Sequence, residues 1–530
     1  MGFWAKSRLI FNFFRDHTKA SIRHIAVETG LSKSSVPRLR QALERRDVHP
    51  ESWLWETAEG RRWLVRLVVA SLYIFGFKRG VGADTISEFL RRLRLEAHVG
   101  SSPSALRGLM EVLEPVLLQT AAAWEREGIA AGEIRPIIGA VDETFLERMM
   151  LVFMDLASGY LLVEEVAADR SYDTWYAVVT ARLTMLGTGV RYLVSDRAKA
   201  LIKLAETGLA CLSIPDLFHL MHDVAKSYSL AILSRLRQAQ QTLTHAQERL
   251  AHCQASHLGA AAIQHAQALV EAHAAEVQRW QHVRSTYRGH LERLSLIMHP
   301  WRVADSARQT SQDVECQLHA EVAALEALVD THGLPRKKNA LAKVRRQLAG
   351  LAALVDAWWQ EVWHDVEAQV ALTPGWKQWI ADLLLPLMYW QEQLSHARGP
   401  TRKAKLVGVL QAITEAFETH PLTQQLAPDV LLGWKTWAAE HARGFQRASS
   451  AVEGRNGALS QLHHNQRGLP RRRYKVWTVV HNFDCRASDG TTPASRFFRR
   501  AFPDLFETVL SQIDDVPRPR QHHQDRAISD

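Results

Sequence analysis

Over the N-terminal part of the chain, hydrophobic positions recur at the three- and four-residue spacing of amphipathic helices. One such stripe covers residues 21–29 and ends at Gly30, and the next begins after Ser32, a residue type suited to an N-cap. The helical spacing then continues over residues 51–133. The pattern therefore predicts two helical blocks, of which the first spans residues 1–50.

At Ile134 the pattern changes to short apolar runs that are rich in β-branched residues and are separated by turn-forming residues. These runs predict strands over residues 134–141, 149–154, 160–166, 190–195 and 210–214. Helical spacing between them predicts helices over residues 172–186 and 197–207. Three strands, a helix, a strand, a helix and a last strand follow one another in the order of the RNase H fold.

Beyond residue 225 the helical spacing returns and continues to residue 440. Leucines at near-heptad positions over residues 227–298, interrupted at Gly259, predict an antiparallel coiled-coil pair. Glycine and proline residues separate the helices that follow. This segment holds many of the tryptophans, and we expect most of them to be core residues of a helical domain.

Together these patterns predict a predominantly helical α+β protein, in which a large all-helical insertion with a coiled-coil hairpin interrupts an RNase H-like mixed sheet. The predicted domains are a helix-turn-helix block (1–50), a second helical DNA-binding or linker block (51–133), the first part of the RNase H-like core (134–225), the helical insertion (226–440), the second part of the core (441–516) and a disordered tail (517–530).

Charge and cysteine content narrow the partners and the compartment. The formal net charge is +9, and the basic residues concentrate in residues 1–50 and 441–500, which favours a polyanionic partner and nucleic acid first. The four cysteines have neither zinc-finger nor disulfide-framework spacing, which fits a reducing compartment. The apolar runs are too short to span a bilayer. We expect a bacterial cytoplasmic protein that associates with the nucleoid.

Three carboxylates stand where an RNase H-like sheet would bring them together. Asp142 ends the first predicted strand, Asp196 ends the fourth, and Glu453 lies in the first turns of a helix that begins near Ser449. Phosphodiester hydrolysis needs an activated oxygen nucleophile and a stabilised leaving oxygen, which two metal ions about 3.5–4 Å apart supply together. Mg²⁺ prefers carboxylate ligands. We predict that these side chains hold two Mg²⁺ ions, for which Mn²⁺ can substitute.

Other carboxylates compete for this role. Glu143 would point to the opposite face of the strand from Asp142, because side chains alternate along a strand. Asp155 begins a turn and is expected to be structural, and Asp223 is the third competitor. Each member of the triad also has a purely structural interpretation, as a turn residue or as a carboxylate favoured at a helix start.

The order of these motifs resembles that of DDE insertion-sequence transposases, with a helical insertion between the second Asp and the Glu as in the hAT and Mutator-like groups. The segment Asp216-Leu-Phe-His219 is similar to the C/DxxH motif of those groups. The resemblance covers most of residues 134–225 and 441–500. It implies that Asp216 and His219 support the active site, and Asn456, one turn beyond Glu453, is expected to do the same.

The N-terminal pattern IAxxTGLSxSxVxRL resembles a bacterial helix-turn-helix, although Pro37 inside the second helix departs from it. The residues at the exposed start of that helix, which would read DNA, are Lys33, Ser34, Ser35 and Arg38. A plain helical hairpin is the alternative. After Glu453, basic residues are expected to contact phosphates, unless they form a solvated face; they are Arg455, Arg467, Arg471, Arg472, Arg473 and Lys475.

These observations predict a DNA transposase that hydrolyses the phosphodiester at the ends of its element and transfers the 3′-hydroxyl into target double-stranded DNA. The resemblance implies at least a homodimer on DNA, because both ends must be held together. Two alternatives stay open. One is a catalytically inactive, domesticated transposase that acts as a sequence-specific DNA-binding protein, and the other is a helical scaffold protein.

Overall fold

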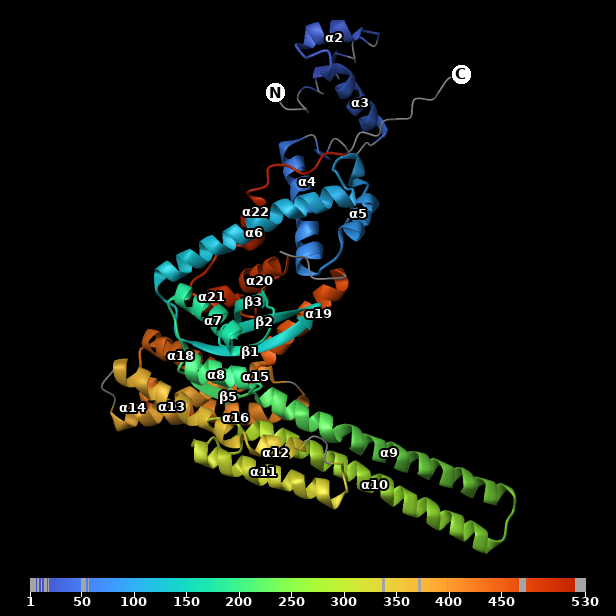
Figure 1. The fold of residues 1–530 in the computed structure, drawn as a ribbon, viewed down its shortest axis with the longest axis vertical. Helices are drawn as coiled ribbons and strands as arrows, with labels where there is room; N and C mark the ends of the chain where they lie inside the picture. Colours follow the sequence, from blue (N-terminus) through green and yellow to red (C-terminus); the bar gives the residue numbers. More distant parts are fainter. Residues whose placement is uncertain are drawn as a thin grey trace. The chain divides into compact units, whose positions relative to one another are not determined.

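The computed structural model describes residues 6, 9–10, 12–13, 17, 19–48, 54–55, 57–335, 339–369, 373–397, 399–466 and 473–519. Contacts within the chain divide it into two compact units, each of which is described by itself (Figure 1). The first contains Met1–Ile134, Phe145–Arg148 and Asn456–Asp530, and the second contains Arg135–Thr144 and Met149–Arg455. Most of the predicted tail, residues 517–530, lies outside the described residues.

The second unit is built on a mixed sheet of five strands in the order β3-β2-β1-β4-β5. The strands are β1 (Ile137–Leu146), β2 (Arg148–Asp155), β3 (Tyr160–Val166), β4 (Val190–Ser195) and β5 (Leu212–Pro215). β2 and β3 are antiparallel, whereas β1 with β4 and β4 with β5 are parallel. This is the strand order of the RNase H-like fold, and it confirms the predicted fold class.

The sheet forms where the sequence has its β-branched runs. Both faces of its central strands are buried. Residues 137–141 of β1 are buried without interruption, as expected of a strand covered on both sides. Gly139 is required there, since a Cβ at this position would lie 2.7 Å from the Phe153 ring and 2.8 Å from Leu193. On the sheet packs α7 (Tyr172–Leu186), which Ser171 caps and Gly187 ends with a φ of 64°.

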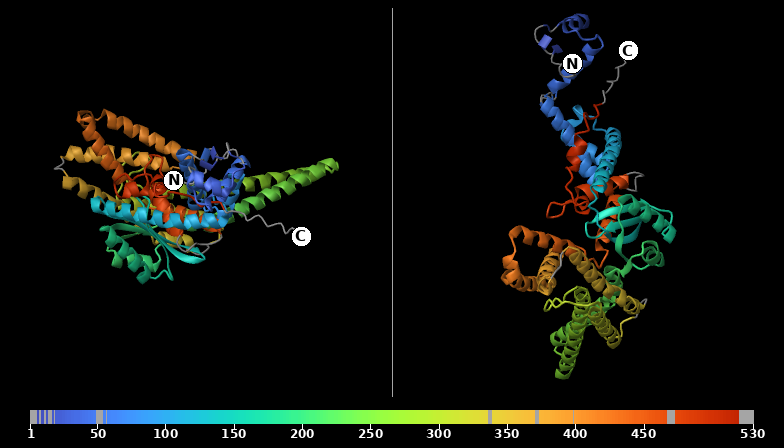
Figure 2. Two further views of the ribbon diagram at one scale, coloured as in Figure 1. Left: turned by 90° about the horizontal axis from the view of Figure 1, so that it is seen from above. Right: turned by 90° about the vertical axis from the view of Figure 1, so that its left-hand side faces the viewer.

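A short helical segment joins β4 to β5, and the long helical insertion follows. The segment comprises α8 (Lys199–Lys203) and η4 (Leu204–Gly208). The insertion opens with α9 (Leu217–Ala255) and α10 (Ala260–Ile297), which run side by side as the predicted antiparallel pair (Figures 1 and 2). α9 begins earlier than the heptad pattern predicts, because Asp216 caps it directly after β5.

Shorter helices complete the insertion. They are α11 (Ser311–Thr331), α12 (Ala340–Arg345), α13 (Leu348–Gln369), α14 (Pro374–Trp379), η6 (Ile380–Leu384), α15 (Leu385–His396), α16 (Pro400–Thr419), α17 (Pro421–Gln425) and α18 (Pro428–Arg443). α13 packs against the edge strand β5, which gives that edge a cover. Over the described residues, no helix combines the length and apolarity needed to cross a membrane.

Aromatic side chains form the core of the insertion, as the sequence predicts. Trp301 and Trp358 are fully buried with ring centroids 5.5 Å apart in an edge-to-face arrangement. Their polar atoms are satisfied, since Trp301 Nε1 donates to Ala381 O at 3.0 Å and Trp358 Nε1 donates to His441 O at 2.9 Å. These tryptophans therefore pack the helices together.

The first unit begins with a small helical module formed by α2 (Ile22–Thr29) and α3 (Ser35–Val48). Its core includes Ile25 and Val36, and Gly30 makes the turn with a φ of 66°. α3 begins at Ser35 rather than directly after Ser32, so the residues between them lie in the turn. The helix-turn-helix arrangement of the sequence is thus present in outline.

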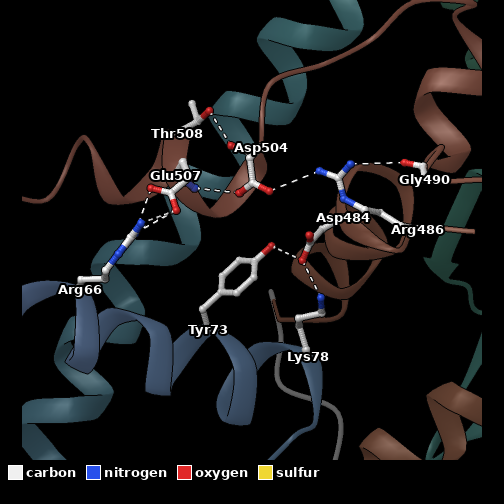
Figure 3. Close-up of polar contacts among 9 residues, drawn as sticks. All are labelled: Arg66, Tyr73, Lys78, Asp484, Arg486, Gly490, Asp504, Glu507 and Thr508. Atoms are coloured by element: carbon white, nitrogen blue, oxygen red, sulfur yellow. Dashed lines mark hydrogen bonds and ion pairs between the residues drawn. The ribbon is translucent and has the colours of Figure 1, made fainter. Parts of the chain in front are cut away.

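The remaining helices of this unit join N-terminal and C-terminal parts of the chain. They are α4 (Ala58–Ser71), η2 (Leu72–Lys78), α5 (Ala83–Arg92), η3 (Leu95–Ala97), α6 (Pro103–Ala131), α20 (Arg473–Asp484), α21 (Pro493–Phe497) and α22 (Leu505–Leu510). Polar contacts link η2 to α20, where Tyr73 Oη and Lys78 Nζ each lie 2.8 Å from Asp484 Oδ2 (Figure 3). Arg66 similarly pairs with Glu507 of α22.

Candidate metal centre

Asp142 lies inside β1, which continues to Leu146 and so extends beyond the predicted strand end at residue 141, whereas Asp196 directly follows the parallel neighbour β4. Ala140 of β1 pairs with Val194 of β4, so two further residues along each strand place Asp142 opposite Asp196. β4 ends at Ser195, however, and Asp196 begins a tight turn in which its Oδ1 accepts a hydrogen bond from Ala198 N at 2.8 Å. Asp196 is exposed, whereas Asp142 is partly buried.

One buried carboxylate sets the start of both helices that reach this end of the sheet. Asp216 caps α9, where its Oδ1 accepts from Phe218 N at 2.8 Å. The same oxygen accepts from Ser449 N at 3.1 Å, and Ser449 Oγ donates to Oδ2. Ser449 directly precedes α19 (Ser450–Gln466). Asp216 therefore holds the first turns of α9 and α19 together, which are the turns that carry His219 and Glu453.

Asp142, His219 and Glu453 form a compact group in which one ligand atom from each residue lies within 4.8 Å of the others. His219 links the group to the helix cap, because its Nδ1 lies 2.6 Å from Asp216 Oδ2 and its Nε2 lies 3.2 Å from Glu453 Oε1. All three side chains of the group are partly exposed. It is the one group of three or more potential metal ligands that the described residues contain.

Electrostatics favour a cation at this position. The pKa of Asp142 is raised to about 7, first by burial and then by the nearby Glu453 carboxylate, while His219 opposes the shift. The hydrogen bond to Asp216 is the main reason that the pKa of His219 is raised to about 9. Without a metal ion, a proton on Asp142 removes one negative charge from the group, and a proton on His219 adds a positive one. Two carboxylates and an imidazole form a donor set that fits a divalent metal ion, which would supply that charge instead.

Metal binding at this group is expected to strengthen as the pH rises. The folded-state pKa of Asp142, about 7, exceeds its ordinary value of 3.8, so its proton stabilises the metal-free protein at low pH and that contribution is lost towards neutral pH. A ligating Asp142 and a ligating His219 must both release their protons. Thermal unfolding with and without Mn²⁺ should therefore show a larger Mn²⁺-induced rise in Tm at about pH 8 than at about pH 6. An equal rise at both pH values would contradict these ligands.

The residues that the sequence predicts for the active site take different positions in the structure. Asp142 and Glu453 come together in this group. His219, which the resemblance implied as a supporting residue, is itself a member of the group. Asp196 lies at the same sheet end without being one of the three, and Asn456 is buried one turn beyond Glu453 on α19. The sequence signal for His219 was the three-residue spacing from Asp216, which places both on one side of the first helical turn.

The competing carboxylates have structural partners. Glu143 accepts a hydrogen bond from Trp175 Nε1 of α7 at 3.4 Å, and burial together with the nearby Asp196 raises its pKa. Asp155 is buried, and its two oxygens accept from Ile138 N and Ser158 N, each at 3.0 Å. As predicted, Asp155 therefore stabilises the turn after β2.

Arg455 is anchored inside the second unit. It lies two residues after Glu453 on α19, and its Nε and Nη2 each lie 2.7 Å from an oxygen of Glu164 on β3. The side chains of Arg455 and Glu164 are 6% and 0% exposed. A guanidinium held in this way cannot reach a phosphate, so the predicted phosphate contact at Arg455 is corrected to an ion pair that fixes α19 on the sheet.

The other predicted DNA contacts lie in the first unit. Lys33, Ser34 and Arg38 are exposed and Ser35 is half-buried, as expected at the start of α3. Arg473 is half-buried with its Nε 2.8 Å from Glu114 Oε1, which makes it a structural ion pair rather than an open phosphate contact. Lys475 is exposed. Three predicted contacts lie outside the described residues: Arg467, Arg471 and Arg472.

Comparison with known protein families finds a match, which covers the C-terminal part of the chain. Residues 380–525 match a model described as a family of unknown function (DUF6399). No curated protein matches the chain. The matched residues include α19 with Glu453, whereas Asp142 and His219 lie outside them. The RNase H-like sheet and the group of Asp142, His219 and Glu453 are consistent with an RNase H-like nuclease or transposase.

Proposed function

We propose that this protein is a DNA transposase of the DDE type, which hydrolyses the phosphodiester at the ends of its element and transfers the 3′-hydroxyl into target DNA. The observation that supports this most is the position of Asp142 and Glu453. Two acidic side chains that are far apart in the chain meet at one end of an RNase H-like sheet, where the pKa of Asp142 is raised to about 7.

Each residue has a role that follows from its position. Asp142 and Glu453 would hold divalent cations, Mg²⁺ or Mn²⁺, and Asp196 would join them from the neighbouring strand end. When bound, two such ions activate the attacking oxygen and stabilise the leaving oxygen. His219 Nε2 faces Glu453 Oε1 at 3.2 Å, and Asp216 orients the His219 ring through the Nδ1 contact. The Arg455–Glu164 pair fixes the helix that carries Glu453.

DNA recognition is proposed for the N-terminal module. Exposed side chains at the turn between α2 and α3 would read base edges at the element ends, as in other helix-turn-helix proteins. The chain carries a net charge of +9, which favours association with double-stranded DNA. We expect at least a homodimer on DNA, because strand transfer requires both ends to be held in one complex.

The proposal is tested by incubating the purified full-length chain with duplexes that carry the DNA flanking its gene. With Mg²⁺ or Mn²⁺ we expect a nick that leaves a 3′-hydroxyl at the element end, followed by joining to a target plasmid; with EDTA we expect neither. Sequencing of the junctions measures both steps. Binding to the ends without any cleavage in Mg²⁺ or Mn²⁺ would instead support the catalytically inactive DNA-binding protein.

Recognition of the ends should depend on the start of α3. We expect the double variant Lys33→Ala/Arg38→Ala to weaken binding to the element end by about 30-fold or more, because each lost base contact costs about 1–3 kcal/mol. Fluorescence anisotropy with an end duplex measures this, and a scrambled duplex of equal length is the control. If the preference for the end over the scrambled duplex is unchanged, α3 does not read the sequence.

A further inference from the structure

A second concentration of positive charge lies in the helical insertion, where α10, α15 and α16 meet. It contains Arg402, in the first turn of α16, and Arg447, in the connection between α18 and α19. Both lie around His299, which directly follows α10 and is fully buried, and around Tyr389 of α15. All four residues belong to the second unit.

The contacts of Arg447 define its side of this cluster. Its Nη1 donates to Met298 O and to His299 Nε2, the latter at 2.9 Å. His299 Nε2 is therefore an acceptor, so that Nδ1 carries the proton and donates to Tyr389 Oη at 2.5 Å. Burial holds the pKa of His299 well below its ordinary value, and the two arginines lower it further. The His299 imidazole is thus neutral and does not balance the positive charge of the Arg447 guanidinium.

Arg402 completes the cluster without supplying an anion either. Its Nη1 lies 3.5 Å from Ser295 Oγ, and its Nε is buried without a hydrogen-bond partner. Glu292, one turn before Ser295 on α10, pairs with Lys405 Nζ at 3.0 Å instead. Among the residues that the structure describes, no carboxylate forms an ion pair with Arg402 or Arg447.

The start of α16 adds to the uncompensated charge. A cation in the first turn of a helix is unfavourable, because the exposed amides there carry partial positive charge. Gly399 precedes the helix with no side-chain cap, and the first turn contains no acidic residue. Two arginines near each other, partly withdrawn from water and without a carboxylate, are costly unless an anion joins them. In agreement, the pKa of Arg447 is lowered to about 10, mainly by burial and to a smaller extent by Arg402, while Tyr389 opposes the shift.

We propose that Arg402 and Arg447 form a binding site for a phosphate oxyanion. Guanidinium groups match the geometry of phosphate oxygens and form charge-assisted hydrogen bonds with them. The phosphate could come from free inorganic phosphate or from a DNA backbone. We assign it to a DNA backbone phosphate, an assignment that rests on the proposed function.

The chain links this site to the metal-binding group. Arg447 O accepts a hydrogen bond from Leu217 N at 3.1 Å, and Leu217 is the first residue of α9. Two residues after Arg447, Ser449 bonds to Asp216, which orients His219. A DNA strand bound at the group of Asp142, His219 and Glu453 would then also contact Arg447. In that case the helical insertion helps to position the DNA substrate.

The first experimental arm uses inorganic phosphate and needs no DNA. We expect about 20 mM phosphate, compared with chloride at equal ionic strength, to raise the Tm of the wild-type chain by about 2 °C. Arg402→Gln should abolish that rise and leave the Tm without phosphate unchanged or higher, because it removes one of two neighbouring positive charges. Arg302→Gln is the matched control, since Arg302 is exposed and pairs with Asp305. It should keep the phosphate response.

The second arm uses duplex DNA without metal. Arg402→Gln and Arg447→Lys should each weaken binding, and Arg402→Gln should reduce the slope of log affinity against log salt by about one phosphate contact, unlike Arg302→Gln. A phosphate response that survives Arg402→Gln, or an Arg402→Gln variant with a clearly lower Tm in chloride, would overturn the site. Loss of the phosphate response with unchanged DNA binding supports the site and assigns it to free phosphate. End cleavage by the wild type is measured separately, so failure of the proposed function remains distinguishable.

Discussion

Asp142→Asn is expected to reduce end cleavage by about a thousandfold or more and to leave binding to the element end within about twofold. Asparagine keeps the size of the side chain but removes the negative charge that would hold a divalent cation between Asp142 and Glu453. The Mn²⁺-induced rise in Tm should disappear together with the cleavage. A gel-based cleavage assay and thermal unfolding of the same preparation measure both effects.

Companion variants decide which side chains hold the metal. Glu453→Gln should lose cleavage and Mn²⁺ binding to the same extent as Asp142→Asn, whether the third ligand is Asp196 or His219. If Asp196 is a ligand, as the sequence predicts, Asp196→Asn should lose cleavage to the same extent. If instead the group seen in the structure is the complete ligand set, His219→Gln should lose Mn²⁺ binding while Asp196→Asn keeps it. Both outcomes are read from the Mn²⁺-induced rise in Tm.

The matched control is Glu143→Gln, which removes a carboxylate from the neighbouring position on the other face of β1. Because Glu143 accepts from Trp175 of α7, we expect this variant to keep cleavage within a small factor. Full cleavage activity in Asp142→Asn would show that the centre of the reaction lies elsewhere. The same conclusion would follow if Glu143→Gln were inactive and Asp142→Asn active.

Arg455→Met is expected to lower the free energy of unfolding of the second unit by about 3–5 kcal/mol, because it leaves the buried Glu164 carboxylate without its partner. The pair is buried on both sides, with both oxygens of Glu164 engaged. Urea denaturation followed by tryptophan fluorescence measures this, since the aromatic core of the helical insertion lies in the same unit.

Two variants separate the ion pair from a general effect of substitution. The double variant Glu164→Leu/Arg455→Met should recover most of the lost stability, because replacing a buried pair by apolar side chains is often close to neutral. Arg302→Met removes an exposed arginine that pairs with Asp305 and should cost less than about 1 kcal/mol. If Arg455→Met is as stable as Arg302→Met, the pair does not anchor α19, and another contact must position Glu453.

Local signals in the sequence determined most of the secondary structure. The helix predicted over residues 172–186 has those bounds in α7, because Ser171 caps it and Gly187 ends it within the segment itself. The strand predicted over residues 190–195 likewise coincides with β4. These features depend on neighbours in the chain, which the sequence displays directly.

The tertiary structure decided which side chains meet across long distances in the chain. Asp216 and Ser449 are 233 residues apart, and their hydrogen bonds help to bring His219 beside Glu453. Glu164 and Arg455 are 291 residues apart, and their pairing turned an expected DNA contact into a buried anchor. Sequence periodicity orients a side chain only relative to its own helix or strand. Which charge it meets depends on how those elements pack, and burial then decides whether that charge must be paired within the protein.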